Sequence, residues 1–265
     1  MNRRRDELLE MLLDRGRLRV DELTAHFGVT GMTVRRDLDA LEKEGLLIRT
    51  HGGCVLQTPK VQELPFREKE QLHREAKETI ARAVVSRVRD GASLYLDTGT
   101  TCATVARLLR RHRRDLQVFT NNLPAALDLF GAEAIEVMIP GGVLGRRSPD
   151  LTGEFGLDRL RDLRLDLAIV GADAFDLASG IFCAADLPTA ALSQTAQRRA
   201  DQTFVCVDGS KFNKRALAVA GRLRQNVTLF TDGEIPATKR RGLRRLGAEV
   251  VIVGKSETPH EHRKE

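Results

Sequence analysis

A loop that could bind a phosphate group follows the short apolar run at residues 93–96. The loop has the sequence DTGTT at residues 97–101, and a stretch with helical spacing, Cys102–Leu109, comes directly after it. Glycine lets the backbone approach an oxyanion, hydroxyl groups add hydrogen-bond donors, and the start of a helix contributes aligned N–H groups with partial positive charge. The candidate ligand-binding residues of this loop are Asp97, Gly99, Thr100 and Thr101.

Four later apolar runs also end in residues suited to a sugar or polyol phosphate. The amides of the TNN sequence at residues 120–122 can both donate and accept hydrogen bonds, as hydroxyl groups require. The carboxylate of the GAD sequence at 171–173 could hold sugar hydroxyls, and the lysine of the DGSK sequence at 208–211 could pair with a phosphate. Each of these short sequences alone is common in turns and helix caps. The further candidates are Thr120, Asn121, Asn122, Gly141, Gly142, Asp173 and Lys211.

The elements that must position these residues are strands that alternate with helices. Most of the apolar runs are followed by helical stretches, which predicts a largely parallel sheet with helices on both faces. Such sheets bind ligands at the carboxyl ends of their strands, so the polar stretches are expected to converge on one crevice. The predicted strands are Ser93–Leu96, Gln117–Thr120, Ile135–Ile139, Leu167–Val170, Thr203–Val207, Val227–Phe230 and Val250–Val253.

A second kind of chemistry, DNA recognition, is indicated by residues 20–55. A short predicted helix ends at Gly28, where a left-handed backbone costs little, and a tight turn follows. In the next predicted helix, Val34, Leu38 and Leu41 recur at i, i+4 and i+7, so they must face a core. Two helices joined by a tight turn are typical of a helix-turn-helix.

The opposite face of that second helix is free to contact a partner. Its two adjacent arginines can form forked hydrogen bonds to guanine edges or to phosphates, although an arginine pair on a helix is by itself most often only solvated. A hairpin with strands at 46–48 and 54–56 around a Gly-Gly turn follows, so the segment predicts a winged helix-turn-helix. The candidate DNA-binding residues are Thr30, which can also cap the helix, Met32, Thr33, Arg35 and Arg36, with Arg49 and His51 on the wing.

The chain resembles the DeoR family of bacterial transcriptional regulators, in which a winged helix-turn-helix precedes a sugar-phosphate sensor. The strings TVRRDL and RTHGG carry the first half of the resemblance, and DTGTT, TNN, PGG, GAD and DGSK, in that order, carry the second. The resemblance implies DNA contact by Arg35 and Arg36. It also implies a sensor domain similar to the sugar-phosphate isomerase fold, with a phosphorylated sugar or polyol as its ligand.

One stretch departs from the pattern of that family. After the glycine that follows the GAD sequence, the family commonly carries an asparagine and a glutamate, whereas this chain has CAADLPT at residues 183–189. Asp186 either replaces the glutamate with a shorter reach, or the chain has no such interaction with the ligand.

We therefore expect an α/β protein with an N-terminal winged helix-turn-helix and a mostly parallel-sheet, Rossmann-like domain. The expected boundaries are 1–56 for the DNA-binding domain, 57–75 for a linker and the start of a connecting helix, 76–254 for the sensor domain and 255–265 for a mobile tail. Pro59 and Pro65 indicate a linker over residues 57–65, and helical spacing then continues from Phe66 to Arg89.

The net charge of +6 does not come from the predicted DNA-binding domain. Residues 1–56 contain ten Lys or Arg and ten Asp or Glu, so the excess lies in the rest of the chain. The positions of the basic residues, and not the net charge of this domain, must then provide its attraction to DNA. A homo-oligomer, a dimer or a tetramer, would multiply the phosphate contacts. The basic cluster Arg107, Arg110, Arg111, Arg113 and Arg114 is expected to be a solvated helix face.

Composition argues against several other classes of protein. The four cysteines lie far apart without a C-x-x-C sequence, so we expect no zinc site, no disulfide framework and no cofactor. No apolar run approaches the length of a membrane helix, and the N-terminal MNRRR sequence leads into an amphipathic helix and not into a signal sequence. We therefore expect a cytoplasmic protein that does not contact membranes.

These features favour a transcriptional regulator that is not an enzyme: a repressor of a carbohydrate-metabolism operon that binds double-stranded operator DNA and is controlled by a phosphorylated sugar or polyol. Two alternatives stay open. One is an isomerase-like enzyme with a fused DNA-binding domain, in which Asp97, Asp173 and Lys211 would supply acid and base groups. The other is a constitutive DNA binder whose C-terminal domain only oligomerises, which the departure around Asp186 would favour.

Overall fold

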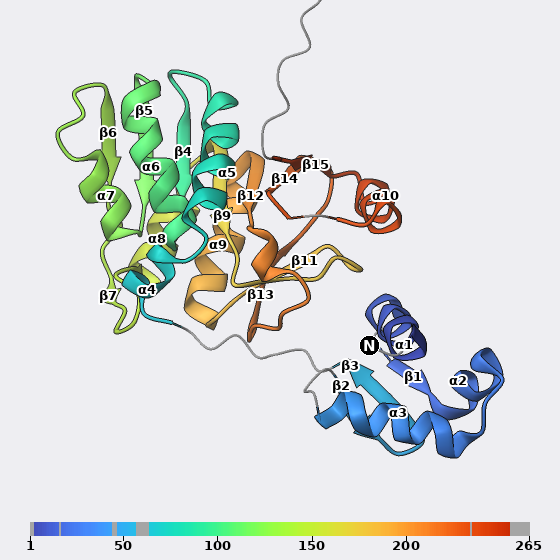
Figure 1. Cartoon of the computed structure of the whole chain (residues 1–265). Helices are drawn as coiled ribbons and strands as arrows, with labels where there is room; N and C mark the ends of the chain where they lie inside the picture. Colours follow the sequence, from blue (N-terminus) through green and yellow to red (C-terminus); the bar gives the residue numbers. More distant parts are fainter. Residues whose placement is uncertain (1–2, 16, 44–46, 57–63, 234, 255–265) are drawn as a thin grey trace, which may run out of the picture. The chain divides into compact units, whose positions relative to one another are not determined.

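The computed structural model describes residues 3–15, 17–43, 47–56, 64–233 and 235–254. The chain divides into two compact units, Met1–Pro59 and Lys60–Glu265, and each unit is described by itself (Figure 1). The predicted linker residues 57–63 and the predicted tail 255–265 lie outside the described residues. None of the described helices is both long enough and apolar enough to cross a membrane.

The N-terminal unit is the predicted winged helix-turn-helix. Val34, Leu38 and Leu41 lie in one buried cluster with Leu23 and Leu47, so the apolar stripe of the second helix faces the core as expected. The three strands form an antiparallel sheet in the order β1-β3-β2. The elements are α1 (Arg3–Arg15), β1 (Arg17–Arg19), α2 (Val20–Phe27), α3 (Gly31–Lys43), β2 (Leu47–Thr50) and β3 (Gly53–Leu56).

The two adjacent glycines of the wing have different roles. Gly52 has a φ of 85°, which a turn requires and which glycine adopts without strain. A Cβ on Gly53 would lie only 2.2 Å from the carbonyl oxygen of Leu18, because β1 passes directly beside β3. The sequence did not predict β1, since it is three residues long with one apolar side chain.

The C-terminal unit contains a sheet of seven parallel strands in the order β15-β14-β12-β9-β4-β5-β6, and each of the seven predicted runs coincides with one of them. The strand order changes direction between β4 and β9, which is where ligands bind in sheets of this kind. The strands are β4 (Ser93–Leu96), β5 (Leu116–Thr120), β6 (Ile135–Met138), β9 (Leu165–Gly171), β12 (Ala200–Cys206), β14 (Val227–Thr231) and β15 (Glu249–Ile252).

Helices cover both faces of this sheet (Figure 1). Leu94 and Leu96 of β4 belong to a buried cluster with α5, α6 and α7, whereas Tyr95, which points to the opposite face, belongs to a second cluster with α8, α9 and α10. The helices are α5 (Arg74–Ser86), α6 (Thr100–His112), α7 (Leu123–Leu129), α8 (Glu154–Arg161), α9 (Leu187–Arg199) and α10 (Ala237–Arg245).

The helix predicted over residues 66–89 is wrong as one continuous element. It is broken into α4 (Phe66–Gln71) and α5, and His73 between them has a φ of 51°. The buried Lys77 of α5 donates hydrogen bonds from its ammonium to the backbone carbonyls of Lys69 and Leu72. These bonds satisfy carbonyls that a continuous helix would use itself, so apolar spacing alone could not reveal the break.

Several short strands were not predicted. β10 (Ala174–Phe175), β11 (Ile181–Ala184) and β13 (Ala218–Arg222) form a small antiparallel sheet, and β7 (Val143–Leu144) pairs with β8 (Leu151–Thr152). These strands pair with one another and not with the strands of the parallel sheet.

Candidate functional site

The first candidate site is the exposed face of α3. Met32 is 71% exposed, and Arg35 and Arg36 are also exposed. Thr30 precedes the helix, and its hydroxyl oxygen accepts a hydrogen bond from the backbone N–H of Thr33 at 3.4 Å, so it caps α3 as the sequence suggested. The structure therefore brings Thr30, Met32, Thr33, Arg35 and Arg36 to one side of the unit's core.

The two wing residues differ in their surroundings. His51 is exposed in the turn between β2 and β3. Arg49 forms an ion pair with Asp39 of α3 and donates a hydrogen bond to the carbonyl oxygen of Arg35 at 3.2 Å. Its backbone N–H also donates to the carboxylate of Glu42 at 2.8 Å. Arg49 thus fastens the wing to the helix that carries the arginine pair.

An unpredicted ion-pair cluster holds α3 in place from behind. The buried Asp37 accepts hydrogen bonds from the Nε atoms of Arg4 at 2.6 Å and Arg5 at 3.0 Å, both on α1. Asp37 lies three residues after Val34, and this helical spacing already placed it beside the apolar stripe. The cluster fixes the orientation of the helix that presents Arg35 and Arg36.

The second candidate site is the carboxyl edge of the seven-stranded sheet. Asp97, directly after β4, is only 2% exposed. Its Oδ1 accepts a hydrogen bond from the backbone N–H of Thr98 at 2.8 Å and lies 3.0 Å from the hydroxyl of Tyr95. Burial raises the pKa of the Asp97 carboxyl to about 7. Asp97 therefore supports its loop from within the core.

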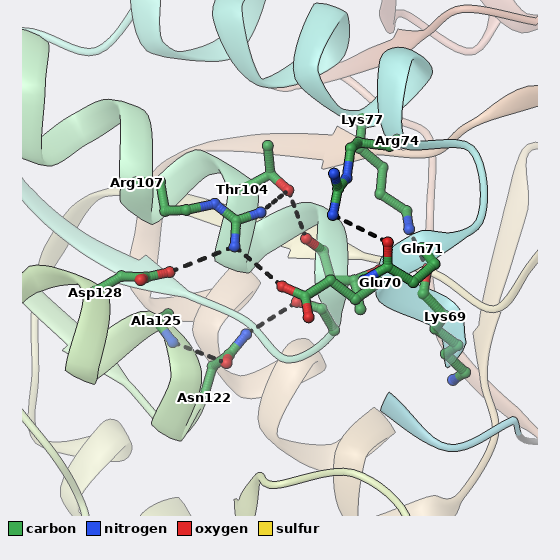
Figure 2. A network of polar contacts seen from close by, with 12 residues as sticks. Lys69, Glu70, Gln71, Arg74, Lys77, Thr104, Arg107, Asn122, Ala125 and Asp128 are labelled. Carbon is green, nitrogen blue, oxygen red and sulfur yellow. Dashed lines mark hydrogen bonds and ion pairs between the residues drawn. The ribbon is translucent and has the colours of Figure 1, made fainter. Parts of the chain in front are cut away.

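The residues after β5 also support this loop. Thr120, Asn121 and Asn122 are fully buried. Asn122 donates from Nδ2 to the carbonyl oxygens of Asp97 at 3.1 Å and Gly99 at 3.0 Å, and its Oδ1 caps α7 (Figure 2). Thr120 donates to the carbonyl of Leu96 at 2.6 Å. These side chains hold the ends of β4 and β5 together.

The phosphate-loop candidates stand at the start of α6. Gly99 precedes the helix with a φ of 89°, and Thr100 and Thr101 form its first turn. Thr100 is buried, whereas Thr101 is partly exposed. The N-terminus of α6 thus offers backbone N–H groups at the edge of the sheet, as an anion requires.

The Gly-Gly pair after β6 shapes a neighbouring hairpin. Gly141 and Gly142 have φ values of 78° and 134°, and a Cβ on Gly142 would lie 2.4 Å from the carbonyl oxygen of Thr152. The hairpin connects to the edge of the sheet through Asn121, whose side chain donates to the carbonyl of Leu151 at 3.0 Å. The pair therefore allows close backbone packing beside the site.

Asp173 of the GAD sequence is paired with a lysine that the sequence did not suggest. The ammonium of Lys69, on α4, lies 3.1 Å from Oδ1 of Asp173, and both side chains are about one fifth exposed. Oδ2 of Asp173 accepts a hydrogen bond from the backbone N–H of Ala185 at 2.9 Å. The carboxylate expected to hold sugar hydroxyls is therefore occupied by a cation from α4.

Arg107 ties α4 to two further helices, which corrects its prediction as part of a solvated face. Its guanidinium lies 3.1 Å from the carboxylate of Glu70 on α4 and 3.7 Å from that of Asp128 on α7, and it donates to the hydroxyl of Thr104 at 2.9 Å (Figure 2). Lys77 donates to backbone carbonyls at the same, C-terminal end of α4. These side-chain contacts at its C-terminal end keep α4 at the sheet edge.

Two more lysines bring positive charge to this edge. Desolvation lowers the pKa of the buried Lys77 ammonium to about 8, and the nearby Asp208 carboxylate and Lys211 ammonium act on it in opposite directions. Lys211 is partly exposed in a short 3-10 turn, η1 (Gly209–Lys211), which Asp208 caps by accepting from the N–H of Ser210 at 3.0 Å. The edge can therefore attract an anion.

Asp186, in the stretch 183–189 that departs from the family pattern, caps α9. Its Oδ1 accepts a hydrogen bond from the backbone N–H of Thr189 at 2.7 Å, while its side chain stays partly exposed. Over the part of the chain that the structure describes, no group of three or more His, Cys, Asp or Glu side chains could hold a metal ion.

Comparison with known proteins matches both units to family models. Residues 4–60 match the DeoR-like helix-turn-helix domain, and residues 72–233 match the DeoR C terminal sensor domain. A putative aga operon transcriptional repressor of Escherichia coli O157:H7 is 34% identical over 254 residues, which are 95% of this chain and 93% of the relative. The glycerol-3-phosphate regulon repressor of Escherichia coli K12 is 31% identical over 89% of this chain and 92% of the relative.

Among solved structures, a D-ribose-5-phosphate isomerase in complex with phospho-erythronic acid aligns with a TM-score of 0.40 and 21% identity, over 52% of this chain and 54% of that chain.

Proposed function

This chain belongs to the DeoR family of transcriptional regulators, and we propose that it represses a carbohydrate-metabolism operon under the control of a phosphorylated sugar or polyol. The observation that carries the proposal is the exposed arginine pair on α3, which Asp37 orients from the buried side. A recognition helix must be held rigidly to place side chains against base edges, and the ion pairs of Asp37 with Arg4 and Arg5 hold α3 in this way.

On the DNA side, we assign base contacts to α3 and phosphate contacts to the wing. Arg35 and Arg36 can form forked hydrogen bonds to guanine or to phosphate, and Met32 and Thr33 can contact bases beside them. His51 lies at the exposed tip of the wing. Arg49 acts through its bonds to α3 and is therefore a positioning residue in this proposal.

On the ligand side, we assign the phosphate to the N-terminus of α6, at Gly99, Thr100 and Thr101, with Lys211 as a nearby cation. Asp173 would accept hydrogen bonds from the hydroxyl groups of the sugar or polyol. Asp97, Thr120, Asn121 and Asn122 are buried, so they would shape the loop, as Gly141 and Gly142 shape the hairpin. Asp186 stays a helix cap.

Helix α4 offers a route from this ligand site to the DNA-binding unit. A ligand whose hydroxyls bind Asp173 competes with Lys69 for the same carboxylate. Loss of that ion pair would loosen α4, and α4 begins only a few residues after the end of the N-terminal unit at Pro59. Ligand binding and operator binding would thereby be coupled through one short helix.

The proposal includes a second copy of the chain and excludes catalysis. Helix-turn-helix proteins commonly bind two half-sites as symmetric dimers, and such a protein acts where the chromosome lies, in the cytoplasm. We infer no enzymatic turnover because Asp97 is buried as a support of its loop and the similar proteins are named transcriptional repressors.

The test is to select an operator from random DNA with the full-length protein and then measure its affinity for single variants. Arg35→Ala and Arg36→Ala are each expected to weaken operator binding by about 1–3 kcal/mol while the unit stays folded. Arg17→Ala, which removes an exposed arginine from β1, serves as the control. Unchanged affinity in both α3 variants, or no selected sequence at all, would contradict the proposal.

A further inference from the structure

Helix α10, at the β14–β15 end of the sheet, carries an unusual concentration of positive charge (Figure 1). Its nine residues have the sequence ATKRRGLRR, and only Leu243 is buried. Arg240, Arg241, Arg244 and Arg245 are all exposed. In the part of the chain that the structure describes, none of these four guanidinium groups forms a side-chain hydrogen bond or an ion pair.

A neighbouring segment adds two more exposed arginines. The chain after α10 packs against residues 223–225, because a Cβ on Gly247 would lie 3.3 Å from the backbone nitrogen of Gln225. Leu246 and Leu223 likewise both lie against Gly180. Arg222 and Arg224, which flank Leu223, are exposed. We call the set Arg222, Arg224, Arg240, Arg241, Arg244 and Arg245 the α10 patch.

The charges of α10 work against the stability of the helix itself. Arg240 and Arg244, and likewise Arg241 and Arg245, are like charges at i and i+4, which repel each other. Only Arg244 and Arg245 lie in the last turn, where the helix dipole favours cations. In α8, by contrast, Arg159 and Arg161 are paired with Asp162 and Asp158. Among the described residues, no carboxylate is paired with these four arginines, so their repulsion suits an anionic partner.

The charge of the N-terminal unit makes DNA the fitting partner. Residues 1–56 carry ten basic and ten acidic residues, whereas the whole chain has a net charge of +6. Affinity for DNA depends strongly on how many phosphates basic side chains neutralise. A DNA-binding unit with equal numbers of basic and acidic residues can supply only part of the attraction to phosphates. The excess positive charge lies in the unit that carries α10.

We propose that the α10 patch is a second DNA-binding surface, which contacts phosphates and does not select the base sequence. This inference rests on the proposed function, since it assumes that the chain binds DNA. Guanidinium groups bind phosphate oxygens through paired hydrogen bonds, so six exposed arginines can engage several phosphates along one duplex. The patch increases affinity for operator and non-operator DNA alike.

The test compares two triple variants of the full-length protein with equal loss of charge. Arg240→Gln/Arg241→Gln/Arg244→Gln removes half of the patch, and Arg82→Gln/Arg159→Gln/Arg161→Gln removes three exposed arginines that are already paired with carboxylates. The affinity for operator DNA and for a shuffled duplex is measured by fluorescence anisotropy over a range of KCl concentrations. Thermal unfolding is measured for each protein.

The patch variant is expected to bind both duplexes more weakly, and the slope of log K against log [KCl] should become less steep by roughly 0.9 for each phosphate that the variant no longer neutralises. Its unfolding midpoint should not fall, because the repulsion within α10 is relieved. The paired-arginine variant should keep the wild-type slope. Equal slopes in the wild type and the patch variant, or equal changes in both variants, would overturn the inference. If the wild type shows no preference for the selected operator, the proposed function fails instead.

Discussion

Asp97 shows how burial changes the chemistry available to a carboxylate at a strand end. The hydroxyl of Tyr95 lies within hydrogen-bond distance of Oδ1 of Asp97 and of Oδ1 of Asn121, at 3.0 and 2.9 Å, but it has only one proton to donate. The amide orientation of Asn121 is set by its bond to the carbonyl of Leu151. A proton on Asp97 completes this network, which agrees with the raised pKa of about 7.

This arrangement predicts that the sensor unit loses stability as the pH rises. An acid whose pKa is raised in the folded state binds its proton more tightly there than in the unfolded chain. The contribution of Asp97 to the free energy of unfolding therefore falls between about pH 4 and pH 7 and is constant above that range. In Asp97→Asn the decline should be smaller. Urea unfolding at several pH values measures the free energy of unfolding. Parallel pH profiles for the wild type and the variant would contradict the raised pKa of Asp97.

Lys69 is predicted to hold the sensor in its unliganded arrangement. Lys69→Met removes the cation from Asp173, so a phosphorylated sugar should bind more tightly, by a factor of about 5 if the mostly buried pair contributes about 1 kcal/mol. Without ligand, the operator affinity of this variant should shift toward that of the ligand-bound wild type. Lys69→Arg keeps the cation and serves as the control. If both variants respond to the ligand as the wild type does, α4 is not the coupling element.

For individual residues, the sequence predicted where the polar stretches lie better than what each of their side chains does. It located the five polar stretches, because each directly follows an apolar run. It could not separate buried loop supports such as Asn122 from exposed residues, since both are polar side chains after strands. It also missed Lys69, because the partner Asp173 is 104 positions away in the chain.

At the scale of elements, α3 is predicted to depend on its attachment to α1. Asp37→Ala removes the acceptor of two charged hydrogen bonds, and the cost should be about 2 kcal/mol, limited because Arg4 and Arg5 can turn toward water. Asp39→Ala removes an exposed partner of Arg49 and should cost less than about 1 kcal/mol. Thermal unfolding of the two variants compares them. Equal losses would show that the buried position of Asp37 is unimportant.

The sequence predicted the elements that are marked by apolar runs. It did not predict features that depend on contacts between residues distant in the chain. All seven strands of the parallel sheet were predicted, because buried parallel strands are continuous apolar runs. The break between α4 and α5 was missed, since it depends on Lys77 bonding to two backbone carbonyls. The short strands β1, β10 and β11 were also missed, and each forms by antiparallel pairing with another short segment.

At the scale of the whole molecule, we expect a second copy of the chain to cover the β6 edge of the sheet. β6 ends the strand order, and beside it Leu127 and Phe130 are 72% and 78% exposed. A pocket of about 470 Å³ lies between α7 and β6, and every residue that lines it is apolar or glycine. Large exposed apolar areas of this kind mark protein interfaces.

This interface predicts that Leu127→Glu/Phe130→Glu lowers the molecular mass in solution to that of one chain. Analytical ultracentrifugation measures the change, with Leu217→Glu, at another exposed leucine, as the control. Operator affinity should fall, because a single chain can bind only one half-site. An unchanged mass for the double variant would place the interface elsewhere.

We expect one phosphorylated ligand at the carboxyl edge of the sheet to control the binding of α3 to DNA. The most direct test measures the operator affinity of the full-length protein with a panel of sugar and polyol phosphates, each beside its unphosphorylated parent. We predict that one phosphate ester changes the affinity by a factor of about 5 to 150, the usual range of allosteric coupling, and that its parent does not. An operator affinity that no phosphate ester changes, or that the parent compound changes equally, would show that a phosphorylated ligand does not control this protein.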